Sequence, residues 1–307
     1  MDLVYYDVRG PGSFTSVKNL QRYVGKDKKT VQKFLSGQDA YTMHKPTRYK
    51  FPRRRTYAKG IDDLYQADLV DVSNISPHND GYRYILTCID VFTKRAWAVP
   101  LKTKSGPEVT SAFEKILVDR KCNMLQTDKG TEWLNSKFQS MLKENGIKFY
   151  TSENDDIKAA VVERFNRTLK SKMWRYFTYK NTRRYLDVLP DLVRSYNNTY
   201  HRSIGTKPVD VDRTNEHVVR KRLYPLPLEK KVTWKYEVGD LVRISMQRRP
   251  FKKGYIGNWS EELLVVDVRH PTRPVTYGIK DLVDETIKGK FYEPEFRRST
   301  RATTFTS

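Results

Sequence analysis

Three acidic side chains stand where carboxylates are costly or conspicuous. Asp68 lies inside the otherwise apolar stretch QADLVDV, Asp128 ends the stretch MLQTD, and Glu163 heads a long basic segment. The first two are 60 residues apart, and Asp128 and Glu163 are 35 residues apart. An acid inside a buried strand destabilises a protein unless it is paired or binds a metal ion. The three positions therefore form a candidate ligand group.

Carboxylate oxygens are the ligands that Mg²⁺ and Mn²⁺ prefer. Three acids that converge repel one another unless cations neutralise them. Two such ions, about 4 Å apart, clamp the attacking and leaving oxygens of a phosphodiester during in-line displacement. If the fold brings Asp68, Asp128 and Glu163 together, their chemistry favours reaction at a phosphodiester with two bound metal ions.

Two of the acids also have a simpler interpretation. Glu163 suits the dipole of a helix N-terminus, and Asp128 before a glycine suits a turn. Five other acids rank lower as ligands. Asp71 points to the opposite strand face from Asp68, Asp90 closes a hairpin, and Glu132 suits the first turn of a helix. The remaining two, Asp155 and Asp156, suit a solvated loop.

The overall charge indicates the partner. The 307 residues carry 58 Lys+Arg against 36 Asp+Glu, for a net charge of +22. Such a surface attracts polyphosphates or anionic membranes. No stretch of about 18 uncharged apolar residues and no signal peptide is visible, which favours nucleic acid over a membrane. We expect a protein that binds nucleic acid, with a nuclear location, although a basic protein of ribosomal type is the plain alternative.

Cysteine and histidine are scarce. The two cysteines, Cys88 and Cys122, rule out a disulfide scaffold and suit a reducing compartment. No C-x2-C or H-x3-5-H pair exists to hold structural zinc. We expect no zinc.

The elements that must position the acids can be read from periodicity. Strands are predicted around residues 65–72, 82–92, 95–101, 123–128 and 147–152. Helices are predicted over 106–120, 133–146, 159–185 and 183–203, the last disturbed at Pro190. In the helix at 159–185, one face is apolar, and Glu163, Arg167, Lys170 and Trp174 share the adjoining stripe. This order predicts an α/β core with a mixed sheet and helices on both faces.

The flanks differ in character from the core. Two short helices within 13–37 either read DNA or only pack, and four short strands from residue 237 onward suggest a small barrel of about five strands. The aromatic residues Trp97, Tyr82, Tyr84 and Trp259 are interpreted as packing residues, whereas Trp174 stays open between DNA contact and packing. The predicted parts are an N-terminal helical region at 1–44, a basic linker at 45–60, a catalytic core at 61–212, a linker at 213–234, a barrel at 235–297 and a disordered tail at 298–307.

Three motifs in order, ADLVDV, LQTDKGTEW and VVERFNRTLK, resemble the Asp-Asp-Glu core of retroviral-type integrases, whose fold is ribonuclease-H-like. The segments GYRYILTCIDVFTKRAWAVPLKTK and YNNTYHRSIGTKPVDV are similar to the integrases of Polinton (Maverick) transposons, as is the C-terminal region. The resemblance covers about residues 1–297. Unlike retroviral integrases, the chain has no His/His/Cys/Cys module near its N-terminus.

The resemblance implies a transposon integrase: metal-dependent 3′-end processing and strand transfer, with Asp68, Asp128 and Glu163 as catalytic ligands of two Mg²⁺ or Mn²⁺ ions. It implies an SH3-like C-terminal DNA-binding barrel and a dimer or tetramer assembled on the element's terminal repeats and target DNA. The expected DNA contacts are Asn166, Arg167, Lys170, Arg53, Arg54, Arg55, Arg248, Lys252 and Lys253.

Two alternatives belong to other functional classes. One is a domesticated, catalytically silent DNA- or chromatin-binding protein, and the other is a ribonuclease-H-like nuclease. Binding alone has no need for three acids, and a minimal nuclease has no need for basic domains on both sides of its core.

Overall fold

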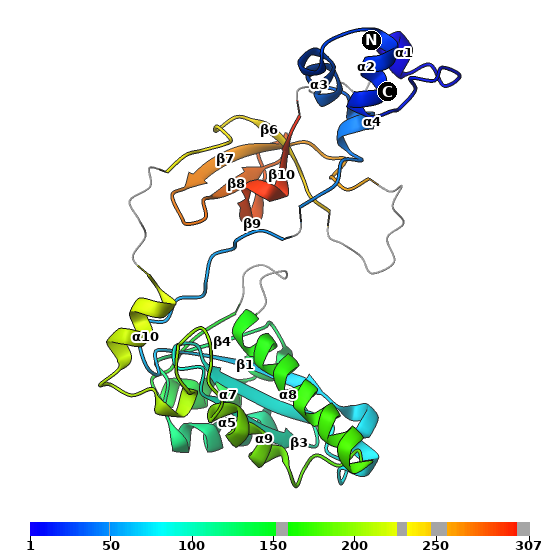
Figure 1. The fold of residues 1–307 in the computed structure, drawn as a ribbon. Helices are drawn as coiled ribbons and strands as arrows, with labels where there is room; N and C mark the ends of the chain where they lie inside the picture. The colour runs from blue at the N-terminus through cyan, green and yellow to red at the C-terminus, as the bar shows by residue number, and fades with distance from the viewer. Residues whose placement is uncertain (49, 152–158, 226–231, 247–256, 300–307) are drawn as a thin grey trace. The chain divides into compact units, whose positions relative to one another are not determined.

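The chain folds into two compact units, described here from a computed structural model (Figure 1). The described residues are 1–48, 50–151, 159–225, 232–246 and 257–299. One unit is continuous and spans residues 56–229, and the other combines residues 1–55 with residues 230–307. None of the helices in the described residues has the length and apolar character needed to cross a bilayer.

The continuous unit is built on a five-stranded sheet with the order β3-β2-β1-β4-β5. Strands β1, β2 and β3 pair antiparallel, whereas β4 pairs parallel with β1 and with β5. The mixed sheet predicted from the sequence is confirmed. The strands are β1 (Leu64–Asp71), β2 (Tyr84–Asp90), β3 (Ala96–Leu101), β4 (Met124–Thr127) and β5 (Lys148–Thr151).

Helices cover both faces of this sheet, as expected (Figure 1). Tyr65 and Ala67 of β1 pack in one core with α5 and α7, while Val70 packs in a second core with α8 and α9. Alternate residues of a strand point to opposite faces, so Asp68 shares the α8 face with Val70. The helices are α5 (Gly106–Asp119), α6 (Thr131–Leu134), α7 (Ser136–Glu144), α8 (Ala160–Lys180), α9 (Leu189–Asn197) and α10 (Glu216–Leu223), with short 3-10 helices η1 (Ser73–His78) and η2 (Pro208–Asp210).

The part of this unit that follows α8 differs from the sequence prediction at two places. The helix expected over 183–203 is limited to α9, which has Pro190 in its first turn. Proline lacks an N–H and suits that position, so it starts this helix instead of disturbing it. The segment expected as a linker from residue 213 contains α10, whose Val219 and Leu223 are buried in a third apolar cluster of the unit.

The second unit joins the two ends of the chain. Its sheet is antiparallel, with the order β10-β6-β7-β8-β9, so the predicted five-stranded C-terminal region is confirmed. The predicted pair of short helices is found as α2 and α3. The elements are α1 (Asp2–Tyr5), α2 (Val17–Val24), α3 (Lys28–Ser36), α4 (Asp39–Thr42), β6 (Leu241–Ile244), β7 (Leu264–His270), β8 (Thr276–Lys280), β9 (Thr286–Tyr292), η3 (Glu293–Glu295) and β10 (Phe296–Arg298).

Polar contacts fasten the N-terminal helices to this sheet. The Arg243 guanidinium is 3% exposed; its Nη2 lies 3.2 Å from Oδ1 of Asp39, and its Nη1 donates to the carbonyl of Ser260 at 2.8 Å. The Trp259 indole donates to the carbonyl of Lys45 at 2.9 Å. Segments about 200 residues apart in the sequence therefore share one folded unit.

Candidate active site

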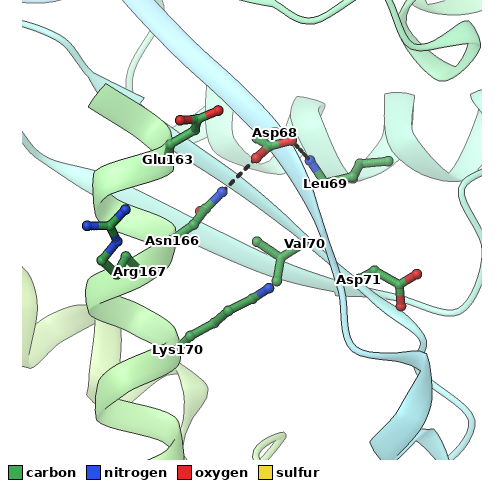
Figure 2. A pocket seen from close by; sticks show the side chains of 8 residues that line it. All are labelled: Asp68, Leu69, Val70, Asp71, Glu163, Asn166, Arg167 and Lys170. Carbon is green, nitrogen blue, oxygen red and sulfur yellow. Dashed lines mark hydrogen bonds between the residues drawn. The ribbon is translucent and has the colours of Figure 1, made fainter. Parts of the chain in front are cut away.

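Strand β1 presents Asp68 toward helix α8. The carboxylate is half-buried: Oδ1 accepts from the backbone N–H of Leu69 at 2.8 Å, and Oδ2 accepts from Nδ2 of Asn166 at 2.8 Å. Figure 2 shows both bonds, one within the strand and one from the helix. These donors hold the carboxylate in one orientation.

Helix α8 presents Glu163 to the same cavity, of about 370 Å³. As predicted, the apolar face of α8 packs on the sheet, and Glu163, Arg167 and Lys170 lie on the stripe beside it. Figure 2 shows Glu163 one turn before Asn166 and near Asp68. The cavity is lined by Asp68, Leu69, Val70, Asp71, Glu163, Asn166, Arg167 and Lys170.

The third acid, Asp128, follows β4 directly. Gln66 pairs with Gln126 in the parallel register of β1 and β4, so Asp68 and Asp128 each come two residues later on neighbouring strands. The side chain of Asp128 is turned into its own loop, where Oδ1 accepts from Nε1 of Trp133 at 2.9 Å and from the N–H of Gly130 at 3.2 Å. Within the described residues, no three Asp, Glu, His or Cys side chains are placed to hold one metal ion.

The donor set nevertheless suits a hard divalent cation. Asp68 and Glu163 bring carboxylate oxygens into one cavity, and the register places Asp128 at the neighbouring strand end. Oxygen-only ligands favour Mg²⁺ or Mn²⁺ over zinc. The three acids would form a ligand set if the Asp128 carboxylate turned from its loop contacts toward the other two.

Asn166, expected as a DNA contact, lies against Asp68. Its side chain is buried, at 7% exposure, and its amide donates to Asp68. A buried amide that bonds to a candidate ligand orients that ligand, which leaves Arg167 and Lys170, both exposed, as the cations of α8 beside the cavity. Asn166 lies three residues after Glu163, which gives the residues a shared helix face.

Asp71 borders the same cavity but has a different environment. Its Oδ1 accepts from the N–H and hydroxyl of Ser73 at 2.8 and 2.6 Å. These bonds, together with the charge of Lys170, lower the pKa of Asp71. In Figure 2 its carboxylate points away from Asp68 and Glu163, so the structure supports ranking it below them.

The other acids have structural surroundings. Asp90 is fully buried and accepts from the N–H of Phe92 and the hydroxyl of Thr93, and burial raises its pKa to about 6. Glu132 lies in the first turn of α6, as expected. Asp155 and Asp156 lie outside the described residues.

Two buried glutamines were missed in the sequence. Gln66 and Gln126 are 0% and 8% exposed, and Nε2 of Gln66 donates to Oε1 of Gln126 at 2.8 Å. Oε1 of Gln66 accepts from the N–H groups of Val161 and Val162. Each glutamine comes two residues before a candidate acid, so strand alternation was the signal that could have identified them.

The remaining expected DNA contacts lie in the other unit. Arg53, Arg54 and Arg55 are exposed; Arg53 lies 3.5 Å from Glu295, and the N–H of Arg54 donates to the Tyr292 hydroxyl at 2.9 Å. Arg248, Lys252 and Lys253 fall outside the described residues.

The tryptophans assigned to packing do pack. The Trp97 ring lies 5.1 Å from that of Tyr65, and Trp259 is 4% exposed. Trp174 is 41% exposed with its ring 5.4 Å from Phe177, so both of its interpretations stay open.

Comparison with known proteins identifies relatives of this arrangement. A family model described as "Integrase core domain" matches residues 61–156. A transposon-derived protein of Caenorhabditis elegans is 38% identical over 221 residues, which are 71% of this chain and 73% of that protein. The Ty1-DR4 Gag-Pol polyprotein of Saccharomyces cerevisiae is 32% identical over 98 residues, 30% of this chain and 6% of the polyprotein.

Solved structures match the fold. A chain of the simian T-cell lymphotropic virus intasome, solved in complex with a PP2A regulatory subunit, aligns with 94% of this chain and 100% of its own length, with a TM-score of 0.65 and 15% identity. At that identity the likeness shows the ribonuclease-H-like integrase architecture and no more. The HTLV-2 integrase catalytic core, solved with magnesium, covers 50% of this chain at a TM-score of 0.43 and 18% identity, and that magnesium is a fact about the viral protein alone.

Proposed function

Since the chain belongs to the integrase core family, we propose that it is a transposon integrase that cuts and joins DNA in a metal-dependent reaction. One observation carries the proposal. Asp68 of β1 and Glu163 of α8 come from distant parts of the sequence and line one cavity, beside the cations Arg167 and Lys170.

The metal ions proposed are Mg²⁺ or Mn²⁺, two per site, held by Asp68, Glu163 and Asp128. When bound, such ions stabilise negative charge on the oxygens of a phosphodiester under attack. Asn166 keeps the Asp68 carboxylate directed into the cavity. The side chain of Asp128 would exchange its bonds to Trp133 and Gly130 for the metal site.

The basic residues of α8 bind the substrate. Arg167 and Lys170 border the cavity and lie on the same helix stripe as Glu163. Their charges neutralise DNA phosphates and release counterions, which makes binding depend on salt. They would hold the DNA backbone where its phosphorus atom faces the acids.

The proposed reaction has two in-line displacements at phosphorus, a hydrolysis followed by a transesterification. In the first, a water oxygen bonds to a phosphorus near the end of the element, and the bridging 3′ oxygen leaves as a 3′-hydroxyl. In the second, that hydroxyl oxygen attacks a phosphorus of target DNA, forms a new phosphodiester and displaces the 3′ oxygen of the target strand. Neither step needs an oxidant, a reductant or a nucleotide cofactor.

Several finer features belong to the same proposal. We propose a Polinton/Maverick origin, a nuclear location and a homo-oligomer that brings two element ends together. The functional division would be the one predicted from the sequence, with the catalytic core at 61–212 and an SH3-like DNA-binding barrel at 235–297.

The direct test incubates the protein with Mg²⁺ and short duplexes that match the element's ends. We expect end nicking and joined products from the wild type, and neither from Asp68→Asn, Asp128→Asn or Glu163→Gln, each of which should still bind DNA. Strand transfer at the normal rate by all three variants would reject the site. A wild type that binds DNA but never cuts it would support the silent DNA-binding alternative, and cutting without joining would support a nuclease.

A further inference from the structure

Helix α8 starts without a capping side chain of its own. The residue before its first turn is Ala159, and no side chain at that position accepts a hydrogen bond. The first N–H groups of any helix have no partner within the helix and must find one elsewhere. Here the sequence around the start of α8, Ala159-Ala160-Val161-Val162, offers only apolar side chains.

A residue 95 positions earlier provides the cap. Oε1 of Gln66 accepts from the N–H of Val161 at 2.9 Å and from the N–H of Val162 at 3.1 Å. Gln66 is completely buried in strand β1. The start of α8, and with it the position of Glu163, is therefore set by a side chain of the central strand.

The amide nitrogen of Gln66 contacts the neighbouring strand, β4. Nε2 of Gln66 donates to Oε1 of Gln126 at 2.8 Å, and Gln126 is itself 8% exposed. The oxygen of Gln66 must accept from the two helix N–H groups, so its nitrogen must point at Gln126. The reversed amide would place donors against donors, which makes the observed orientation the one the contacts require.

These contacts join the three elements that carry the candidate acids. Gln66 comes two residues before Asp68 on the same strand face, Gln126 comes two residues before Asp128, and the capped turn of α8 leads directly into Glu163. A buried amide pair is costly to disturb, because each unpartnered polar atom left behind is not solvated.

We propose that Gln66 and Gln126 are positioning residues that set the separation of Asp68, Asp128 and Glu163 and so allow the three acids to share metal ions. The inference rests on the proposed function. Neither glutamine lines the cavity that holds Asp68 and Glu163, so their action passes through the strands and the helix start.

The first test measures the cap without metal or DNA. Amide hydrogen exchange at Val161 and Val162 is compared in the wild type, Gln66→Leu, Gln66→Glu and Gln126→Leu. Gln66→Leu removes the capping acceptor of both N–H groups, and the loss of one bond at each is expected to speed its exchange about tenfold. Gln66→Glu keeps an acceptor oxygen for both N–H groups and should restore protection. Equal exchange in Gln66→Leu and the wild type would refute the cap.

The second test measures metal binding with Mn²⁺ alone, followed by electron paramagnetic resonance, together with the Mg²⁺ concentration needed for half-maximal nicking. Gln66→Leu and Gln126→Leu should each weaken Mn²⁺ binding about tenfold or more, in the range found for residues that orient metal ligands. The nicking reaction should need correspondingly more Mg²⁺.

Gln38→Leu is the matched control. Gln38 is also a buried glutamine, 6% exposed, that accepts from the Tyr6 hydroxyl at 3.0 Å, but it lies in the other folded unit. It should lower thermal stability and leave Mn²⁺ binding unchanged. If Gln66→Leu fails to fold, Gln126→Leu decides the question, because it removes only one of the three bonds of Gln66.

The outcomes separate the two proposals. A wild type that neither binds Mn²⁺ nor nicks DNA refutes the proposed function. A wild type that does both, while Gln66→Leu and Gln126→Leu bind Mn²⁺ and respond to Mg²⁺ normally, refutes the positioning role and leaves the function intact.

Discussion

The amide of Asn166 lies 2.8 Å from Oδ2 of Asp68 and joins helix α8 to strand β1 at the candidate site. The two residues are 98 positions apart in the sequence. Because Asn166 follows Glu163 by one helix turn, the bond also relates the Asp68 carboxylate to the second acid of the cavity (Figure 2).

Replacing Asn166 with leucine should impair catalysis more than binding. The variant loses the donor that orients Asp68, so we expect end nicking to fall about tenfold or more, with DNA affinity nearly unchanged. The control is Asn197→Leu, which removes the two bonds of Asn197 to the backbone of Ala96, each 2.9 Å, away from the cavity. Nicking by folded Asn197→Leu should match the wild type. If both variants lose the same activity per folded molecule, the specific role of Asn166 is rejected.

Lys170→Ala should weaken DNA binding and reduce its dependence on salt. Lys170 is exposed beside the cavity, and its charge helps to lower the pKa of Asp71. Loss of one phosphate contact reduces the slope of log affinity against log salt by about one. Lys172→Ala is the matched control, because the amine of Lys172 bonds to the Ser195 hydroxyl at 2.9 Å. Identical slopes for wild type and Lys170→Ala, measured by fluorescence anisotropy, would remove Lys170 from the contacts.

Asp90 should make stability depend on pH in the direction opposite to a salt-bridged acid. Burial raises the pKa of Asp90 from 3.8 to about 6. Between pH 3.8 and about 6, the folded protein binds the proton of Asp90 more tightly than the unfolded chain does. The contribution of Asp90 to the free energy of unfolding is therefore complete below about pH 4 and is lost as the pH rises through about 6. The expected loss is on the order of 3 kcal/mol in free energy of unfolding.

Asp90→Asn keeps a neutral side chain of the same shape and isolates this effect. Urea unfolding from pH 4 to 7 should show the wild type losing stability relative to the variant as pH rises. Subtracting the two curves cancels the carboxylates with lowered pKa, such as Asp80 and Asp212. A constant difference across this range would contradict the assignment.

Asp39→Asn should destabilise the unit that joins the two ends of the chain. The buried Arg243 guanidinium would lose its carboxylate partner at 3.2 Å, which we expect to cost about 2 kcal/mol. Asp191→Asn makes the same change in the exposed pair with Arg194, at 3.6 Å, and should cost less than about 0.5 kcal/mol. Thermal unfolding of the wild type and both variants provides the measurement. If Asp39→Asn melts at the same temperature as Asp191→Asn, Asp39 is dispensable for the stability of this unit.

Much of the fold was predictable because its signals are local. The alternation in β1, the apolar face of α8 and the two short N-terminal helices all follow from a few neighbouring residues. Periodicity also placed Glu163 beside Arg167 and Lys170, since a helix fixes which residues share a stripe. The limits of α9 were wrong because the effect of Pro190 depends on whether it lies in the first turn or further inside.

The sequence by itself determined the types of element and the three acids worth testing. Only the tertiary structure decided that Asn166 is buried against Asp68 and that Gln66 caps a helix 95 residues away. Periodicity reports on neighbours along one element, whereas these contacts depend on the register between β1 and β4 and on how α8 packs across the sheet. That register and packing arise from the whole core, so no short stretch of sequence contains them.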